Sequence, residues 1–164
     1  MSRKNGMGAH QSAKMKNDEW LTPPAVLEKL GTFDLDPCSP IARPWNTARV
    51  HFSKEQDGLA QQWFGRVWCN PPYGKEASLW LEKLSNHNQG TALIFARTET
   101  DMFFRWVWRK ASAVLFIQGR LYFYDVNGRV APANSGAPSV LVAYGSRDKE
   151  ILRMCGIPGK FIEL

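Results

Sequence analysis

Residues 68–74 read Trp-Cys-Asn-Pro-Pro-Tyr-Gly, which places a side-chain amide, two rigid carbonyl groups and an aromatic ring in one short stretch. Pro71 and Pro72 each fix a φ angle and lack a backbone N–H, so neither a helix nor a central strand can pass through them. The residue before a proline adopts extended geometry, which suits Asn70 as the last residue of a strand. Carbonyl acceptors held this rigidly could stabilise positive charge that develops on an amino group, and Tyr73 offers a ring face for stacking.

The motif has to be held by neighbouring elements, and the sequence predicts an alternation of apolar strands and helices. Thr22 and Gly31 suit the cap and the end of a short helix, and Asn127-Gly128 between β-prone runs is typical of a hairpin. The expected helices cover 21–31, 75–86 and 101–111, with a turn and half-helix at 57–63. The expected strands cover 32–40 (broken at Pro37), 48–53, 66–70, 91–97, 113–119 and 138–145, with the hairpin at 120–130.

This order of elements predicts an α/β fold of three layers, with a mostly parallel sheet and an antiparallel edge strand or hairpin near its end. In such sheets, ligands bind outside the carboxyl ends of the strands. Asp36 and Asn70 both fall at predicted strand ends, so we expect them to lie around one crevice.

The composition is that of an ordinary globular protein, with 44% hydrophobic and 22% charged residues in a chain of 164. We expect one domain at residues 18–164, preceded by a flexible basic tail at residues 1–17. No apolar run is long enough for a membrane span, and the first residues lack the hydrophobic stretch of a secretory signal. The three cysteines form neither a zinc pattern nor a disulfide framework, which predicts a reducing cytoplasm and no metal. A net charge of +6 makes a polyanionic partner plausible.

Further motifs accompany the central one. They are DEWLTPP at 18–24, FDLDPCS at 33–39, DGL at 57–59 with a tryptophan at 63, NPPYG at 70–74, ARTETDMFF at 96–104 and GRLYF at 119–123. In this order they resemble the phage-type DNA N6-adenine methyltransferase family, small Dam-like enzymes of bacteriophages and prophages. The resemblance implies a Rossmann-like, S-adenosylmethionine-dependent domain that methylates adenine N6 in double-stranded DNA. It also implies protection of phage DNA against host restriction, in the host cytoplasm.

The resemblance implies roles for single residues as well. Asn70, Pro71, Pro72 and Tyr73 match the catalytic motif, with two acceptors for the N6 protons and a ring for the extruded base. Cofactor binding is implied for Trp20, Thr22, Pro23, Asp36, Pro37, Asp57 and Asn70, with the Thr-Pro pair at the methionine end and the Asp36 carboxylate at the α-ammonium group. The turn at 38–45 departs from most methyltransferases because it contains no glycine.

Basic residues beside these motifs are candidates for DNA-binding contacts to phosphates, which would add salt dependence rather than sequence information. They are Lys75, Arg97, Arg105, Arg109, Arg120 and Arg129. The 120–138 region, which also carries Tyr122, Tyr124 and Asn127, is where we expect the DNA groove to be read.

Other interpretations stay open. The central motif also fits a methyltransferase of a protein glutamine or of an RNA guanine amino group, and the glycine-free turn leaves room for a DNA-binding relative without catalysis. Asp36 could simply cap the segment that follows it, and Asp57 could be an ordinary turn residue. The oligomeric state stays open, with a slight preference for a monomer. Core positions are expected for Cys69, Trp63, Trp68, Trp80, Trp106 and Trp108.

Overall fold

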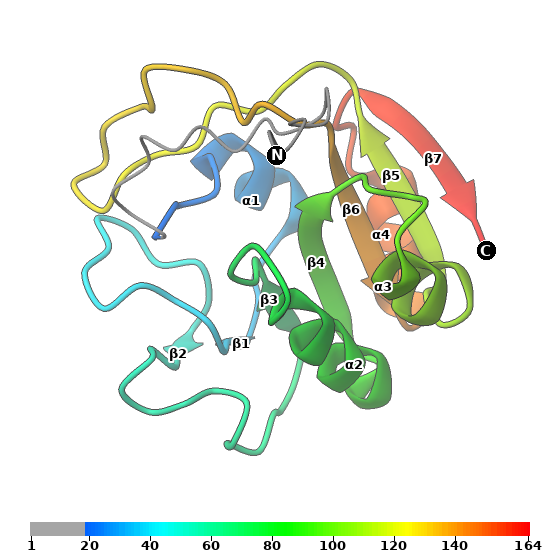
Figure 1. The fold of residues 1–164 in the computed structure, drawn as a ribbon, viewed down its shortest axis with the longest axis horizontal. Coiled ribbons are helices and arrows are strands. Elements are labelled where there is room, and N and C mark those ends of the chain that lie inside the picture. The colour runs from blue at the N-terminus through cyan, green and yellow to red at the C-terminus, as the bar shows by residue number, and fades with distance from the viewer. Residues whose placement is uncertain (1–18) are drawn as a thin grey trace, which may run out of the picture.

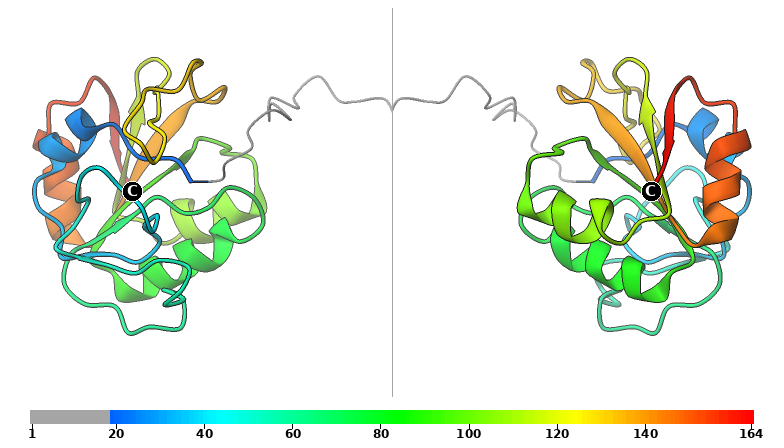
Figure 2. Two further views of the ribbon diagram at one scale, coloured as in Figure 1. Left: turned by 90° about the vertical axis from the view of Figure 1, so that its left-hand side faces the viewer. Right: turned by 90° about the vertical axis from the view of Figure 1, so that its right-hand side faces the viewer.

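The computed structural model describes residues 19–164, so the tail expected at residues 1–17 lies outside the described residues. The strands are β1 (Leu35–Asp36), β2 (Val50–His51), β3 (Val67–Cys69), β4 (Gly90–Phe95), β5 (Ala113–Ile117), β6 (Ser139–Tyr144) and β7 (Gly159–Glu163). The helices are α1 (Pro24–Leu30), α2 (Ala77–His87), α3 (Asp101–Phe103), the π-helix η1 (Phe104–Trp108) and α4 (Ser146–Met154). All seven strands form one sheet in the order β2-β1-β3-β4-β6-β5-β7 (Figure 1). Helices α1 and α4 cover one face of this sheet, and α2 and α3 cover the other (Figure 2).

The direction of the strands differs from the prediction in one half of the sheet. Parallel pairing joins β2, β1, β3 and β4, whereas β6 is antiparallel to both β4 and β5, and β7 is antiparallel to β5. The α/β class is confirmed, but antiparallel pairing is not restricted to an edge, because β6 lies between β4 and β5. All six residues of β6 are buried, as expected for an internal strand covered on both faces.

The hairpin predicted at 120–130 forms its turn but does not join the sheet. Tyr124 pairs through isolated antiparallel bridges with Val130 on one side and with Leu21 on the other. Two backbone hydrogen bonds join Leu21 and Tyr124, with N···O distances of 2.8 and 3.0 Å. The segment after β5 is therefore attached to the N-terminal part of the domain, and the prediction of an edge hairpin is wrong.

Two further elements are built differently from the prediction. Of the turn and half-helix expected at 57–63, the structure forms the turn but no helix, and Asp57 has a left-handed φ of 51° that lies outside the right-handed helical region. The helix expected at 101–111 is one turn of α-helix followed by η1. The Tyr144 hydroxyl donates to the Trp106 carbonyl oxygen at 2.6 Å, which takes this carbonyl out of the regular helical ladder.

Two hydrophobic layers hold the strands in place. In β4, Ala92 and Ile94 face the layer under α2 and η1, while Leu93 faces the layer under α1 and α4. The first layer runs from Leu35 in β1 to Val114 in β5, and the second runs from Trp68 in β3 to Leu115 in β5. The parallel pairing of β1 with β3 fixes the carboxyl ends of these two strands side by side. The structure buries Cys69, Trp63, Trp68 and Trp80 as expected, and leaves Trp106 and Trp108 half-buried.

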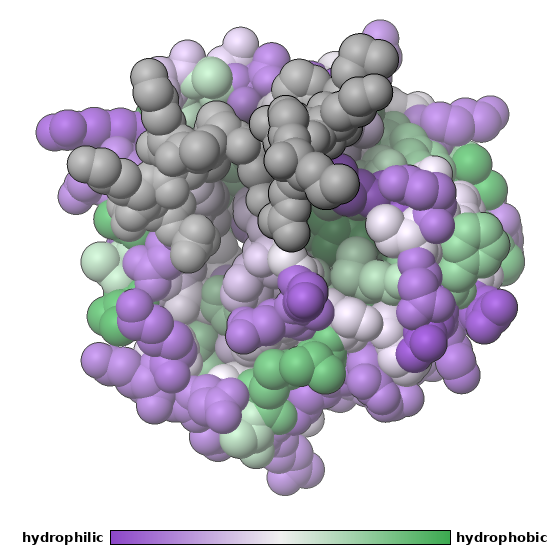
Figure 3. All heavy atoms as spheres, viewed as in Figure 1, coloured by the Kyte–Doolittle hydropathy of each residue, from purple (hydrophilic) through white to green (hydrophobic). Residues whose placement is uncertain are grey.

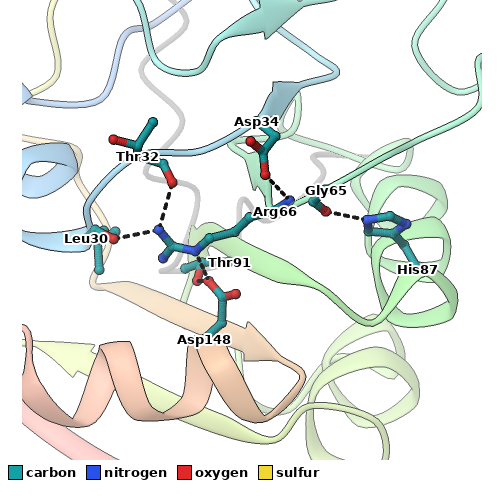
Figure 4. A network of polar contacts seen from close by, with 8 residues as sticks. All are labelled: Leu30, Thr32, Asp34, Gly65, Arg66, His87, Thr91 and Asp148. Carbon is teal, nitrogen blue, oxygen red and sulfur yellow. Dashed lines mark hydrogen bonds and ion pairs between the residues drawn. The ribbon is translucent and has the colours of Figure 1, made fainter.

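A buried ion pair joins α4 to the amino ends of β3 and β4 (Figure 4). Arg66 Nε donates to Asp148 Oδ1 at 2.9 Å, and only 1% and 0% of the two side chains is exposed. Thr91 Oγ1 donates to the same carboxylate oxygen at 2.7 Å, and Arg66 Nη1 donates to the Leu30 carbonyl oxygen at 2.6 Å. Burial lowers the pKa of Arg66, and the Asp148 carboxylate opposes this shift. One guanidinium group thus ties together α1, β3, β4 and α4.

Replacing Asp148 by asparagine is expected to lower the free energy of unfolding by about 3–5 kcal/mol, because the Arg66 charge would remain buried without a counter-charge. Denaturant unfolding at constant pH measures the difference. The control is Arg105→Ala, since the Arg105–Asp101 pair is largely exposed; it is expected to lower the same free energy by less than about 0.5 kcal/mol. Equal losses in the two variants would contradict the prediction.

Candidate active site

The predicted strand ends meet at one edge of the sheet. β1 ends at Asp36, Asn70 directly follows β3, and these two strands are adjacent and parallel. A cavity of about 480 Å³ opens at this edge. Figure 3 shows hydrophobic side chains in a hollow of this face and hydrophilic side chains around it. The crevice expected from the order of the elements is therefore present.

Seven of the residues proposed from the sequence line this cavity: Trp20, Pro37, Asp57, Asn70, Pro71, Pro72 and Tyr73. Thr22, Pro23 and Asp36 do not line it. Thr22 and Asp36 are buried, and each contacts a lining residue, Asn70 and Cys38 respectively. The lining is completed by residues outside the proposed set: Glu19, Cys38, Ser39, Pro40, Ser53, Lys54, Gly58, Leu59, Glu76, Leu79 and Trp80.

The Asn70 side chain is held by its nitrogen. Nδ2 donates to Thr22 Oγ1 at 3.3 Å and to the Trp20 carbonyl oxygen at 3.5 Å. No residue within 19–164 donates to Asn70 Oδ1, and Asn70 lines the cavity. The amide is thus oriented with its donor end bonded to the protein and its acceptor end free for a ligand.

The Tyr73 ring lies flat on a second ring. Its centroid is 4.4 Å from that of Phe95, and the two planes differ by 3°. Tyr73 remains 38% exposed, so the ring face away from Phe95 is open for stacking. Burial raises the pKa of Tyr73 above its ordinary value, so its hydroxyl keeps its proton at neutral pH. The side chain can therefore act as a stacking surface but not as a base.

Asp36 is buried beneath the cavity, with 4% of the residue exposed. Thr47 Oγ1 donates to Oδ2, and the Cys38 backbone N–H donates to Oδ1 at 3.1 Å. Burial raises the pKa of Asp36 to about 6, and the bonds from Thr47 and Cys38 and the nearby charge of Arg43 oppose this shift. The carboxylate does cap the following turn, as one reading of the sequence held, and it is also a buried charge that a cation would stabilise.

The Asp57-Gly58 pair forms one wall of the cavity. A Cβ atom at position 58 would lie 1.9 Å from the Pro37 carbonyl oxygen, so only glycine allows the two loops to approach this closely. The Gly58 carbonyl oxygen accepts from Trp63 Nε1 at 2.8 Å. Lys83 Nζ also donates to the Leu59 carbonyl oxygen at 2.5 Å. Asp57 is thus a turn residue whose loop is fixed against β1, and it lines the cavity as well.

The glycine-free turn after β1 is shaped by side chains instead. The Asp36 cap fixes its first backbone N–H, and the Ser39 N–H donates to the Phe52 carbonyl oxygen at 3.0 Å. Cys38 Sγ donates to the Asn70 carbonyl oxygen at 3.3 Å and lies 3.9 Å from Cys69 Sγ. The contact with Cys69 and burial raise the pKa of the Cys38 thiol well above its ordinary value, so this group is not a thiolate nucleophile.

The directions of the strands indicate which of the proposed DNA-binding residues lie near the cavity edge of the sheet. β5 runs in the same direction as β3 and β4, so the segment with Arg120 and Arg129 leaves the sheet at the cavity edge. Lys75 lies two residues after Tyr73, and Arg97 lies two residues after the end of β4, at the same edge. Arg105 is engaged with Asp101 at 2.8 Å.

The chain continues from η1 toward the amino end of β5, which takes Arg109 away from the cavity edge. The structure therefore does not bring Arg109 together with the other candidates.

Some residues that line the cavity were not predicted from the sequence, and Trp80 and the Glu19–Lys54 pair are examples. Trp80 was expected only in the core; it is buried and stacks against Trp63 with centroids 6.2 Å apart, yet it also lines the cavity from α2. Glu19 and Lys54 lie 3.9 Å apart on the lining, although 35 positions of sequence, 54 − 19, separate them. No local pattern marks these residues, because only the convergence of several loops brings them together.

Within residues 19–164, no group of three or more histidine, cysteine, aspartate or glutamate side chains is placed to hold a metal ion. In the same part of the chain, no helix has the length and apolar character that crossing a membrane would require.

The chain matches the family model described as DNA N-6-adenine-methyltransferase (Dam) over residues 9–154. No curated protein matches the chain, and neither does any solved structure. The match agrees with the resemblance of the ordered sequence motifs, and it includes every residue proposed for the site.

Proposed function

Since this chain belongs to the DNA N-6-adenine-methyltransferase (Dam) family, we propose that it transfers a methyl group from S-adenosylmethionine to adenine N6 in double-stranded DNA. One observation carries the proposal at the site itself. Asn70 lines the cavity with its amide nitrogen bonded to the protein and its amide oxygen available, which is the arrangement needed to bind an amino group.

The cavity suits S-adenosylmethionine in size and in charge. Its volume of about 480 Å³ lies in the range of about 300–1,000 Å³ that is usual for small-molecule sites. Asp36 offers a buried carboxylate that has no ion-pair partner among residues 19–164, which suits an α-ammonium group. Trp20, Pro37 and Asp57 would contact the molecule from the cavity wall. When bound, it supplies a methyl group carried on a positively charged sulfur.

The catalytic motif would act through hydrogen-bond acceptors. The N6 lone pair of adenine is delocalised into the ring, so this nitrogen is a poor nucleophile that becomes positively charged as the new bond forms. Asn70 Oδ1 and the Pro71 carbonyl oxygen would accept hydrogen bonds from both N6 protons, which favours a tetrahedral nitrogen and stabilises the charge. Pro71 and Pro72 restrict the backbone, so these acceptors need little rearrangement during the reaction.

The target base has to leave the duplex to reach this cavity, which costs a few kcal/mol. Stacking on the open face of Tyr73 would return about 1–3 kcal/mol of this cost. Phe95 supports the opposite face of the ring, so the stacking surface is already oriented. Lys75, Arg97, Arg120 and Arg129 at the cavity edge would contact DNA phosphates, and Arg105 would have to release Asp101 to do so.

The biological role we propose is modification of phage or prophage DNA, in the host cytoplasm, as protection against restriction. The positive net charge of the chain suits a DNA partner.

The test is transfer of a labelled methyl group from S-adenosylmethionine to unmethylated DNA, followed by digestion and nucleoside chromatography. We expect the label in N6-methyldeoxyadenosine, and much less label in the same time with Asn70→Ala or Tyr73→Ala. Unlabelled DNA despite cofactor binding in a calorimeter would reject the DNA substrate and direct the same assay to RNA and to protein glutamine. Absence of cofactor binding would instead identify a DNA-binding relative without catalysis.

A further inference from the structure

We propose that Thr22 is a positioning residue for Asn70: its hydroxyl group holds the amide nitrogen so that the amide oxygen faces the cavity. The inference rests on the proposed function of Asn70. It assigns Thr22 a role that differs from the one implied by the family resemblance.

The location of Thr22 supports this role. Only 1% of the residue is exposed, and it does not line the cavity. Its Oγ1 is 3.3 Å from Asn70 Nδ2, so the hydroxyl oxygen contacts the side chain that does line the cavity.

The contact matters because an amide has two different ends. Rotating the Asn70 amide by half a turn would point its NH₂ group at the amino group of the substrate, donor against donor. The Trp20 carbonyl, 3.5 Å from Nδ2, can only accept hydrogen bonds and therefore excludes Oδ1 from that side. A hydroxyl group can donate as well as accept, so the Trp20 carbonyl decides which end of the amide lies on this side. Thr22 Oγ1 accepts the shorter of the two bonds from Nδ2 and so holds the amide in the orientation that presents Oδ1 to the cavity.

Thr22 is itself fixed from both sides. Leu21, which precedes it, is held by two backbone hydrogen bonds to Tyr124, at 2.8 and 3.0 Å. Pro23, which follows it, is the N-cap of α1, and its carbonyl oxygen accepts from the Val26 N–H at 3.0 Å. The hydroxyl group therefore has a defined position before any ligand binds, as a positioning residue requires.

The experiment compares Thr22→Val, which keeps the shape and removes the hydroxyl, with Thr22→Ser, which keeps the hydroxyl. We expect Thr22→Val to lower kcat for DNA methylation by about 10- to 100-fold, as a misoriented catalytic group does. We expect Thr22→Ser to remain close to the wild type. The dissociation constant of S-adenosylmethionine, measured by calorimetry, should be unchanged in both variants. Thermal unfolding checks that the variants are folded, and Thr22→Ala replaces the valine variant if that one is not.

A second readout does not depend on activity. In ¹⁵N-labelled protein without ligands, the side-chain NH₂ signals of Asn70 are assigned by their loss in Asn70→Ala. We expect them to shift in Thr22→Val and to stay near their wild-type position in Thr22→Ser. Unchanged signals in Thr22→Val, weaker cofactor binding at constant kcat, or equal damage by serine and valine would each overturn the inference. A wild type that does not methylate DNA would reject the proposed function, while the NMR comparison would still decide the role of Thr22.

Discussion

Replacing Asn70 by alanine is expected to lower kcat for adenine methylation by at least about 10²- to 10³-fold, the usual effect of removing one hydrogen-bond partner of a transition-state charge. The variant loses Oδ1 but keeps the Pro71 carbonyl oxygen, which the rigid backbone holds in place. Single-turnover methylation at saturating cofactor and DNA measures this change without a contribution from product release.

The matched control is Asn86→Ala, the same chemical change at an exposed position of α2. We expect Asn86→Ala to have wild-type activity, and Asn70→Ala to bind S-adenosylmethionine with nearly unchanged affinity, because the Asp36 carboxylate and the cavity wall remain. A decrease of less than about fivefold in kcat for Asn70→Ala would show that this amide does not stabilise the transition state.

The affinity for S-adenosylmethionine is expected to fall about tenfold per pH unit as the pH drops below about 6. In the free protein, burial raises the pKa of Asp36 to about 6, so at lower pH the carboxyl group carries a proton. An α-ammonium group requires the charged carboxylate, so binding must release that proton. Above this pH the carboxylate is already charged, and the affinity should level off. Calorimetry between about pH 5 and 7 tests this, because an α-amino group stays protonated over that range.

Asp36→Asn is the variant that isolates this effect. We expect it to bind S-adenosylmethionine at least about tenfold more weakly at pH 7, because the ammonium group loses its counter-charge. We also expect its affinity to be independent of pH in the range where the wild type changes. If Asp36→Asn kept the wild-type slope, another group would be the one that titrates.

The pH dependence of the free energy of unfolding cannot replace the measurement of cofactor affinity, because it does not isolate the titration of Asp36. The pKa of Asp36 rises on folding from 3.8 to about 6, so its stabilising contribution is complete below 3.8 and is lost as the pH rises through 6. The pKa of His51 falls from 6.5 to about 4, through burial and the nearby Arg43, so its contribution is complete above 6.5 and is lost as the pH falls through 4. The two groups act in opposite directions over the same range, so unfolding experiments would show only their difference.

The sequence predicted the strand, turn and helix around Asn70 because prolines act locally. It also predicted that Asp36 and Asn70 meet, because parallel strands bring their carboxyl ends to one edge. The insertion of β6 between β4 and β5 could not be predicted in this way, since the apolar run of β6 fits any internal position of a sheet. Likewise, the bond from Asn70 to Thr22 spans 48 positions of sequence and depends on the pairing of Leu21 with Tyr124.

The last helix and strand were missed for a different reason. α4 has a weak apolar pattern: its only buried residues are Leu152 and the charged Asp148, whose burial depends on Arg66 far away in the sequence. β7 is short and mostly exposed, so it lacks the apolar run by which the internal strands were found.

β7 covers the edge of β5, which would otherwise be open to strands from other molecules. The family match ends at residue 154, and β7 lies beyond this point in the sequence. β7 pairs with all five residues of β5. A protein shortened to the matched region would leave the backbone N–H and C=O groups of β5 unpaired along an apolar strand, and such an edge recruits strands from other molecules. In the longer chain the outermost strand instead carries the exposed charges of Lys160 and Glu163, which disfavour further strand addition. The strand farthest from the cavity thus acts against aggregation.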